Sequence, residues 1–232
     1  MDKATLYPDL EVIASKASYK QIFDIFYTIT QVRYATQKQL QPLNHRVATK
    51  KNLDSLVSSG YLAAVNLVKN DKAFHITEKT RQILENEGYN VKVIQKKSTG
   101  QTLDHALKIS DCLLKLQAQE HFYQVFYPTF QEPPKYDSPF LRPDACVVWK
   151  RDGAYKIEFI EVEEIKPNWA EYLFVKKEKY EQLASDPNIY HVWWKYYADK
   201  LNLPLCTEAD FCLSVVCFGN IKKNWEGWNW QV

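Results

Sequence analysis

Carboxylate side chains in the second half of the sequence have the spacing of a metal-dependent hydrolytic site. Glu161 and Glu163 lie two positions apart in residues 155–163, which read as a β-strand. Alternate side chains of a strand share one face, so both carboxylates would point to the same side. Asp144 lies in a strand-like segment just before a turn at Arg151-Asp152-Gly153. A hairpin of the two strands could therefore supply Asp144 as a third carboxylate.

Three converging carboxylates are suitable ligands for a hard divalent cation such as Mg²⁺ or Mn²⁺. Such an ion activates water and stabilises the charge on a phosphate that is being cleaved. We therefore expect Asp144, Glu161 and Glu163 to be metal ligands. The alternative is that both glutamates lie at a solvent-exposed strand end, where Glu158 and Glu164 continue an acidic edge.

A lysine downstream of this strand could complete the site. Asn168 and Glu171 have capping-box spacing, which predicts a helix over residues 169–184. Lys176 lies at the centre of its apolar stripe, so its ammonium could face the carboxylates, stabilise the transition state or orient the water. Alternatively, its side chain extends past the stripe to solvent. The candidate catalytic residues are Asp144, Glu161, Glu163 and Lys176.

The first part of the chain predicts a separate module. Periodicity and capping residues indicate helices over 19–30, 36–41 and 45–59, strands over 61–68 and 72–77, and a helix over 78–87. Asn44 and Thr77 are the expected caps of the third and last helices. This order is that of a winged helix-turn-helix, whose third helix enters the DNA major groove and whose hairpin contacts the backbone.

The charge of this module favours DNA as its partner. Residues 1–100 carry 15 Lys and Arg against 9 Asp and Glu, whereas the rest of the chain carries 15 against 19. We expect salt-sensitive binding of double-stranded DNA, dominated by phosphate contacts. The alternatives are that the lysines are merely solvated, or that the module docks a protein. The candidate DNA-binding residues are Arg46, Lys50, Lys51, Lys69 and Lys72.

The charge reversal predicts two domains, at residues 1–95 and 101–232, joined by the polar stretch 95–101. The second domain reads as a helix over 102–118, strands over 122–130, 141–149 and 155–163, the helix after Asn168, and an apolar strand over 211–218. This order of elements, with Pro-Asp and Glu-x-Glu motifs, resembles the PD-(D/E)xK nuclease superfamily. The resemblance implies an α+β or α/β fold, in which helices flank a restriction-endonuclease-like mixed sheet.

More narrowly, a winged helix followed by "RPDACVVWKRDGAYKIEFIEVEE" and a "KKEKY" helix resembles the replication-relaxation family. That family is associated with plasmids, phages and other mobile elements, and is linked to replication and DNA relaxation. The resemblance covers about residues 20–195. It implies that Asp144 is the Asp of the Pro-Asp motif and Glu161 the first acidic residue of (D/E)xK. Glu163 stands where the superfamily usually has lysine, and Lys176 on the next helix would replace it.

Two main functions and a weaker third follow from these patterns. One is a DNA-binding protein of a mobile element that cleaves phosphodiesters with a divalent ion, and the retained Asp144 and Glu161 favour it. The other is an inactive replication or transfer accessory factor, or a transcriptional regulator, and Glu163 in place of lysine favours it. Its nuclease-like domain would then serve as a scaffold for a homodimer or for replication or transfer proteins. A third is a protein-docking module without a DNA role.

Composition narrows the protein class further. The five cysteines form no Cys-x-x-Cys pair, so they read as buried thiols of a reducing compartment rather than zinc ligands or a disulfide framework. No apolar run approaches the roughly 20 residues that span a bilayer, and the N-terminus lacks a signal peptide, so we expect a cytoplasmic protein without a membrane partner. The tryptophans near the C-terminus could pack on the core, form a dimer surface or stack on bases.

Overall fold

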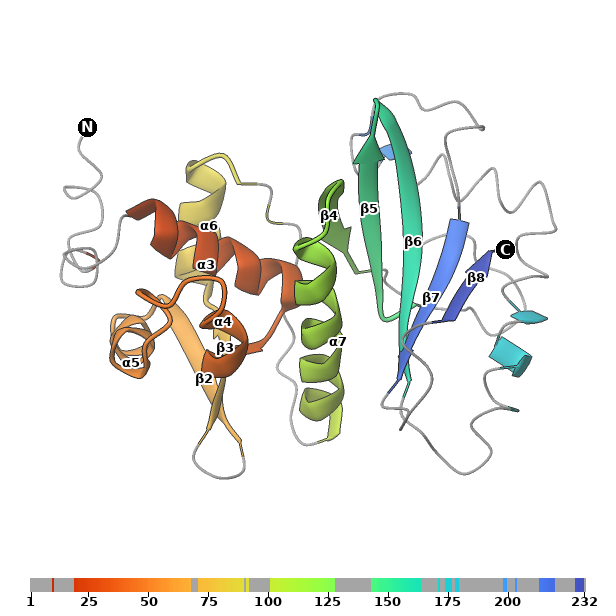
Figure 1. Cartoon of the computed structure of the whole chain (residues 1–232). Coiled ribbons are helices and arrows are strands. Elements are labelled where there is room, and N and C mark those ends of the chain that lie inside the picture. The colour runs from red at the N-terminus through yellow and green to blue at the C-terminus, as the bar shows by residue number, and fades with distance from the viewer. Residues whose placement is uncertain are drawn as a thin grey trace. The chain divides into compact units, whose positions relative to one another are not determined.

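The computed structural model describes residues 10, 19–67, 71–89, 91, 101–127, 143–163, 171, 174–176, 178–179, 198–199, 203, 213–219 and 228–231. These residues form an α+β fold with two sheets (Figure 1). One sheet has three antiparallel strands and the other has five strands of mixed direction. Contacts divide the chain into two units, Met1–Lys115 and Leu116–Val232.

The first unit contains five helices and the three-stranded sheet among its described residues. They are α3 (Tyr19–Val32), β1 (Ala35–Thr36), α4 (Gln37–Leu40), α5 (Lys50–Ser58), β2 (Leu62–Asn66), β3 (Lys72–Ile76), α6 (Glu78–Asn86) and α7 (Gln101–Gln117). The apolar stripe of α3 is fully buried, and its Phe26 stacks on Tyr61 with ring centroids 5.9 Å apart. The predicted helices and hairpin are therefore present, in the predicted order.

Threonine caps fix where three of the helices begin. Thr36, Thr49 and Thr77 each accept a hydrogen bond from a backbone N–H three residues later, as expected of N-cap side chains. The predicted cap Asn44 instead holds a turn, because its Oδ1 accepts from the N–H groups of Arg46 and Val47 at 3.2 Å. Helix α5 consequently begins at Lys50 rather than at residue 45.

Helix α7 packs against other elements of the first unit, whereas the predicted second domain, residues 101–232, includes it. The buried hydroxyl of Ser110 lies 2.6 Å from the carbonyl oxygen of Tyr34. Gln39 Nε2 donates to the carbonyl of Leu107 at 3.1 Å and to Asp111 Oδ1 at 2.6 Å. These bonds tie α7 to the start of the sheet and to α4. Most of the predicted boundary, residues 95–101, lies outside the described residues.

The second unit is built on the sheet β4-β5-β6-β7-β8 (Figure 1). Its strands are β4 (Phe122–Phe126), β5 (Ala145–Arg151), β6 (Ala154–Glu163), β7 (Leu213–Gly219) and β8 (Trp228–Gln231). Strands β5 and β6 form the predicted hairpin, and its turn places Asp152 and Gly153 at positive φ. The strand predicted over the apolar run 211–218 is confirmed for its described residues, which belong to β7, and β7 pairs with β6 in parallel.

The inner strands position the acidic residues. Residues 145–148 of β5 are wholly buried, which fits a central strand covered on both faces. Register pairs Ala145 with Ile160, so the start of β5 lies beside the end of β6. No helix among the described residues is long and apolar enough to cross a membrane.

Candidate functional site

An ion pair joins the end of β6 to the segment that follows it. Lys176 Nζ lies 2.7 Å from Glu161 Oε2, and the two side chains are 14% and 1% exposed. Lys176 is helical, as are residues 171, 174, 175, 178 and 179, and all of them lie within the predicted helix. The structure therefore brings together the lysine and the first strand carboxylate that the sequence singled out.

Asp144 lies immediately before β5 and contacts the end of β6. Its Oδ2 accepts a hydrogen bond from the backbone N–H of Val162 at 2.8 Å. Val162 follows Glu161 in β6, so this bond holds the Asp144 carboxylate at the same end of the hairpin. Asp144 thereby binds the backbone of the strand that carries Glu161.

The surroundings of Glu161 are apolar. Phe159 shares its strand face and is 1% exposed, and Cys146 is opposite Phe159 on β5 and wholly buried. Burial raises the pKa of the Cys146 thiol well above its ordinary value of 9.0, and the charge of Glu161 raises it further. Charges interact strongly in such surroundings because little water screens them. Glu161 and Lys176 therefore depend on each other more than a surface pair would.

The structure describes the side chains of two of the three predicted metal ligands. Glu163 ends β6, but its side chain lies outside the described part of the chain. Within that part, no group of three His, Cys, Asp or Glu residues is placed to hold a metal ion. The two placed carboxylates, Asp144 and Glu161, have the oxygen chemistry that Mg²⁺ or Mn²⁺ prefers, and each already contacts a protein donor. The three-carboxylate site stays a prediction.

In the first unit, several basic side chains are held by contacts within the protein. Lys72 Nζ lies 2.7 Å from Asp54 Oδ1. Lys79 Nζ donates to the carbonyl of Ser59 at 3.1 Å and lies 3.9 Å from the centroid of the Tyr61 ring. These contacts direct Lys72 toward α5 and Lys79 toward the end of that helix.

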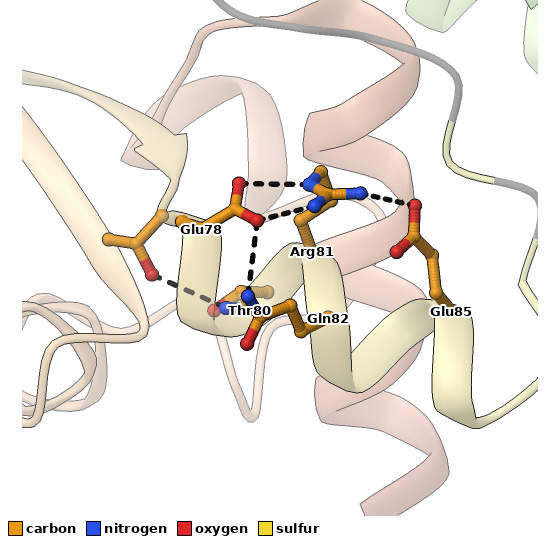
Figure 2. A network of polar contacts seen from close by, with 6 residues as sticks. Glu78, Thr80, Arg81, Gln82 and Glu85 are labelled. Carbon is orange, nitrogen blue, oxygen red and sulfur yellow. Dashed lines mark hydrogen bonds and ion pairs between the residues drawn. The ribbon is translucent and has the colours of Figure 1, made fainter.

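Arg81 is neutralised on the surface of α6. Figure 2 shows its guanidinium between Glu78 and Glu85, with Nε 2.9 Å from Glu78 Oε2 and Nη1 2.5 Å from Glu85 Oε1. Gln82 Nε2 also donates to Glu78, at 3.2 Å. The hydrogen bond from Arg81 lowers the pKa of Glu78 below its ordinary value of 4.5. These contacts join residues within α6, and they leave little of the Arg81 charge available to a binding partner.

Four further cations of the first unit lie on α4, on α5 and between them. Lys38, Arg46, Lys50 and Lys51 are exposed and make no ion pair with another described residue. Three of them are predicted DNA contacts, and Lys38 was not among the predicted contacts. Lys38 lies in α4, which begins at a capping box formed by Thr36 and Gln39. The predicted contact Lys69 lies outside the described residues.

Fold and sites together define a two-unit α+β protein, with exposed cations on a small helical unit and a buried acid–lysine pair on a mixed sheet. The chain belongs to the replication-relaxation family, whose model matches residues 26–193, more than half of its length. The match runs from α3 past Lys176 and includes both candidate regions. No curated protein and no solved structure shows significant similarity to the chain. Family membership suggests a role in the replication or relaxation of mobile elements.

Proposed function

We propose that the chain binds double-stranded DNA of a plasmid, phage or other mobile element through a winged helix formed by its first unit. The order α3, β1, α4, α5, β2, β3 is that of such a module, with α5 in the place of the helix that enters the major groove. The observation that carries the proposal is a group of exposed cations that make no ion pair with any other described residue: Lys38, Arg46, Lys50 and Lys51.

The contacts expected of these residues are mainly with phosphates. Lys50 and Lys51 form the first turn of α5, the end of a recognition helix that approaches the bases. Lysine side chains there would bind the DNA backbone and orient the helix without reading sequence by themselves. Each phosphate contact contributes about −0.9 to the slope of log K against log salt concentration. Few contacts therefore imply modest and salt-sensitive affinity.

Fluorescence anisotropy with a labelled duplex of mixed sequence tests this function. We expect binding at low salt that weakens steeply as salt is added, with a slope of about −3 to −4 if each of the four cations neutralises one phosphate. Absence of binding at low salt would contradict the proposal. It would favour the alternative in which this unit docks a protein.

A second candidate function is metal-dependent cleavage of DNA by the second unit, and the contact of Lys176 with Glu161 beside Asp144 favours it. In this proposal the mixed sheet is a PD-(D/E)xK-like core, and Asp144, Glu161 and Glu163 hold Mg²⁺ or Mn²⁺. The ion would supply activation of water and neutralisation of phosphate charge. Lys176 would take the place of the motif lysine and stabilise negative charge on the phosphate.

Cleavage of supercoiled plasmid in Mg²⁺ or Mn²⁺ tests this candidate. We expect nicking by the wild type and its loss in Asp144→Asn and Glu161→Gln. Asp152→Asn is the matched control, because it makes the same change at the exposed turn of the same hairpin and should leave nicking intact. Circular dichroism of each variant reports whether it is folded.

Nicking that survives both substitutions would exclude this site as its source. Binding of DNA without nicking would favour the inactive alternative, an accessory factor or transcriptional regulator. Its second unit would then be a scaffold for a homodimer or for a replication or transfer protein, and analytical ultracentrifugation would test the homodimer.

A further inference from the structure

An acidic side chain, Asp54, lies on the same side of α5 as the lysines proposed to contact DNA. Asp54 follows Lys51 by three positions and Lys50 by four, and residues at these spacings are neighbours on a helix surface. Asp54 is partly exposed, with 38% of its side chain accessible. A carboxylate at this place would face the phosphates that Lys50 and Lys51 attract.

Asp54 is held by a cation from the hairpin. Lys72 is the first residue of β3, and its Nζ lies 2.7 Å from Asp54 Oδ1. The neighbouring hydroxyls of Ser55 and Ser58 donate to carbonyls within α5, those of Lys51 and Asp54. In the described contacts of Asp54, Ser55 and Ser58, only Asp54 joins this side of α5 to the hairpin, through its ion pair with Lys72.

Stability alone is a weak explanation for the pair. Lys72 is 36% exposed and Asp54 38%, and ion pairs of such exposure contribute little to the free energy of unfolding. The effect of the ion pair on the binding of a polyanion such as DNA would be larger. The pair occupies a cation that would otherwise be available to phosphate, and it adds a negative charge beside Lys50 and Lys51.

We propose that the Asp54–Lys72 ion pair suppresses sequence-independent binding of duplex DNA by the first unit. This inference rests on the proposed DNA-binding function. Binding to arbitrary sequence comes from phosphate contacts, and a protein must find its site among a large excess of such sequence. A protein with fewer phosphate contacts is therefore held less tightly by this excess of arbitrary sequence.

Asp54→Asn tests the inference on a duplex of mixed sequence. The substitution removes the repulsion and releases Lys72, so we expect about three- to tenfold tighter binding and a salt slope steeper by about one. Asp24→Asn is the matched control, because Asp24 is exposed on α3 and the variant makes the same charge change away from α5. Its affinity and slope should equal those of the wild type.

Lys72→Gln separates the two effects of the pair. Alone it should weaken binding, because Asp54 keeps its charge without its lysine. Added to Asp54→Asn, it should remove the extra salt dependence, because the released cation is gone, while part of the gain in affinity remains.

Each outcome decides between the two proposals. If the wild type binds and Asp54→Asn binds with the same affinity and slope, the inference is wrong and DNA binding stands. If neither protein binds at low salt, both are wrong. If Asp24→Asn tightens binding as much as Asp54→Asn, the effect is one of net charge and the inference is overturned.

Discussion

Lys176→Met is expected to lower the free energy of unfolding of the second unit by about 3–5 kcal/mol. Glu161 is 1% exposed and would lose the cation 2.7 Å from its carboxylate, while the apolar stem of methionine still fills space. Denaturant unfolding followed by tryptophan fluorescence measures the change. This signal reports the second unit because all seven tryptophans lie at or beyond residue 149.

Two further variants make this result specific. Glu161→Gln combined with Lys176→Met removes both charges and should recover much of the lost stability, because breaking a buried pair costs more than replacing it. Lys156→Met is the matched control, since Lys156 lies 2.6 Å from Glu158 but is 39% exposed. It should cost less than about 1 kcal/mol. Equal losses for Lys176→Met and Lys156→Met would show that burial does not strengthen the Glu161 pair.

A buried ion pair also bears on function. Apolar side chains of similar volume are often at least as stabilising as a buried pair, so stability is a poor explanation for Glu161 and Lys176. Functional sites are where a chain departs from the most stable choice. The pair thus agrees with the second candidate function, which plasmid cleavage would test independently.

Local signals in the sequence sufficed for most of the first unit. Thr77 was expected to cap the helix after the hairpin, and its side chain accepts from the N–H of Thr80 as predicted. The apolar spacing of α3 indicated a buried stripe, which the structure confirms. These features depend on residues within one or two turns of each other, so the sequence alone determines them.

Features that depend on distant residues could not be read in this way. Asn44 and Thr49 are both good caps, but Asn44 holds a turn and α5 begins after Thr49, where Asn52 also donates to the carbonyl of Arg46. The apolar stripe of α7 indicated burial but not its partner, which is the first unit. The tryptophan-rich ending was considered for packing, a dimer surface or stacking on bases, and the strand that its residues Trp228–Gln231 form, β8, was not predicted.

The same difference between local and distant residues applies to the candidate site. Alternation along β6 and the stripe around Lys176 predicted that this lysine could face the strand carboxylates, and it contacts Glu161. The bond between Asp144 and the backbone N–H of Val162 depends on register, which residue types do not encode. Asp54 and Lys72 meet only because the hairpin lies beside α5, so neither residue alone indicated the pair.

Lys50→Gln combined with Lys51→Gln is expected to weaken binding of mixed-sequence duplex by on the order of 10- to 100-fold at moderate salt. Both side chains are exposed in the first turn of α5 and unpaired among the described residues, so their charge is available to phosphates. Losing two phosphate contacts should also reduce the salt slope by about 1.8. Anisotropy titrations at several salt concentrations measure both quantities.

Lys20→Gln combined with Lys115→Gln is the matched control for this pair. Both lysines are exposed, on α3 and α7, so the control removes the same charge from the first unit outside α4 and α5. It should change the affinity by less than about threefold, and neither double variant should unfold, because all four side chains lie on the surface. Equal losses in the two variants would mean that DNA responds to net charge alone. That result would contradict the placement of the DNA contacts on α5, even if the chain binds DNA.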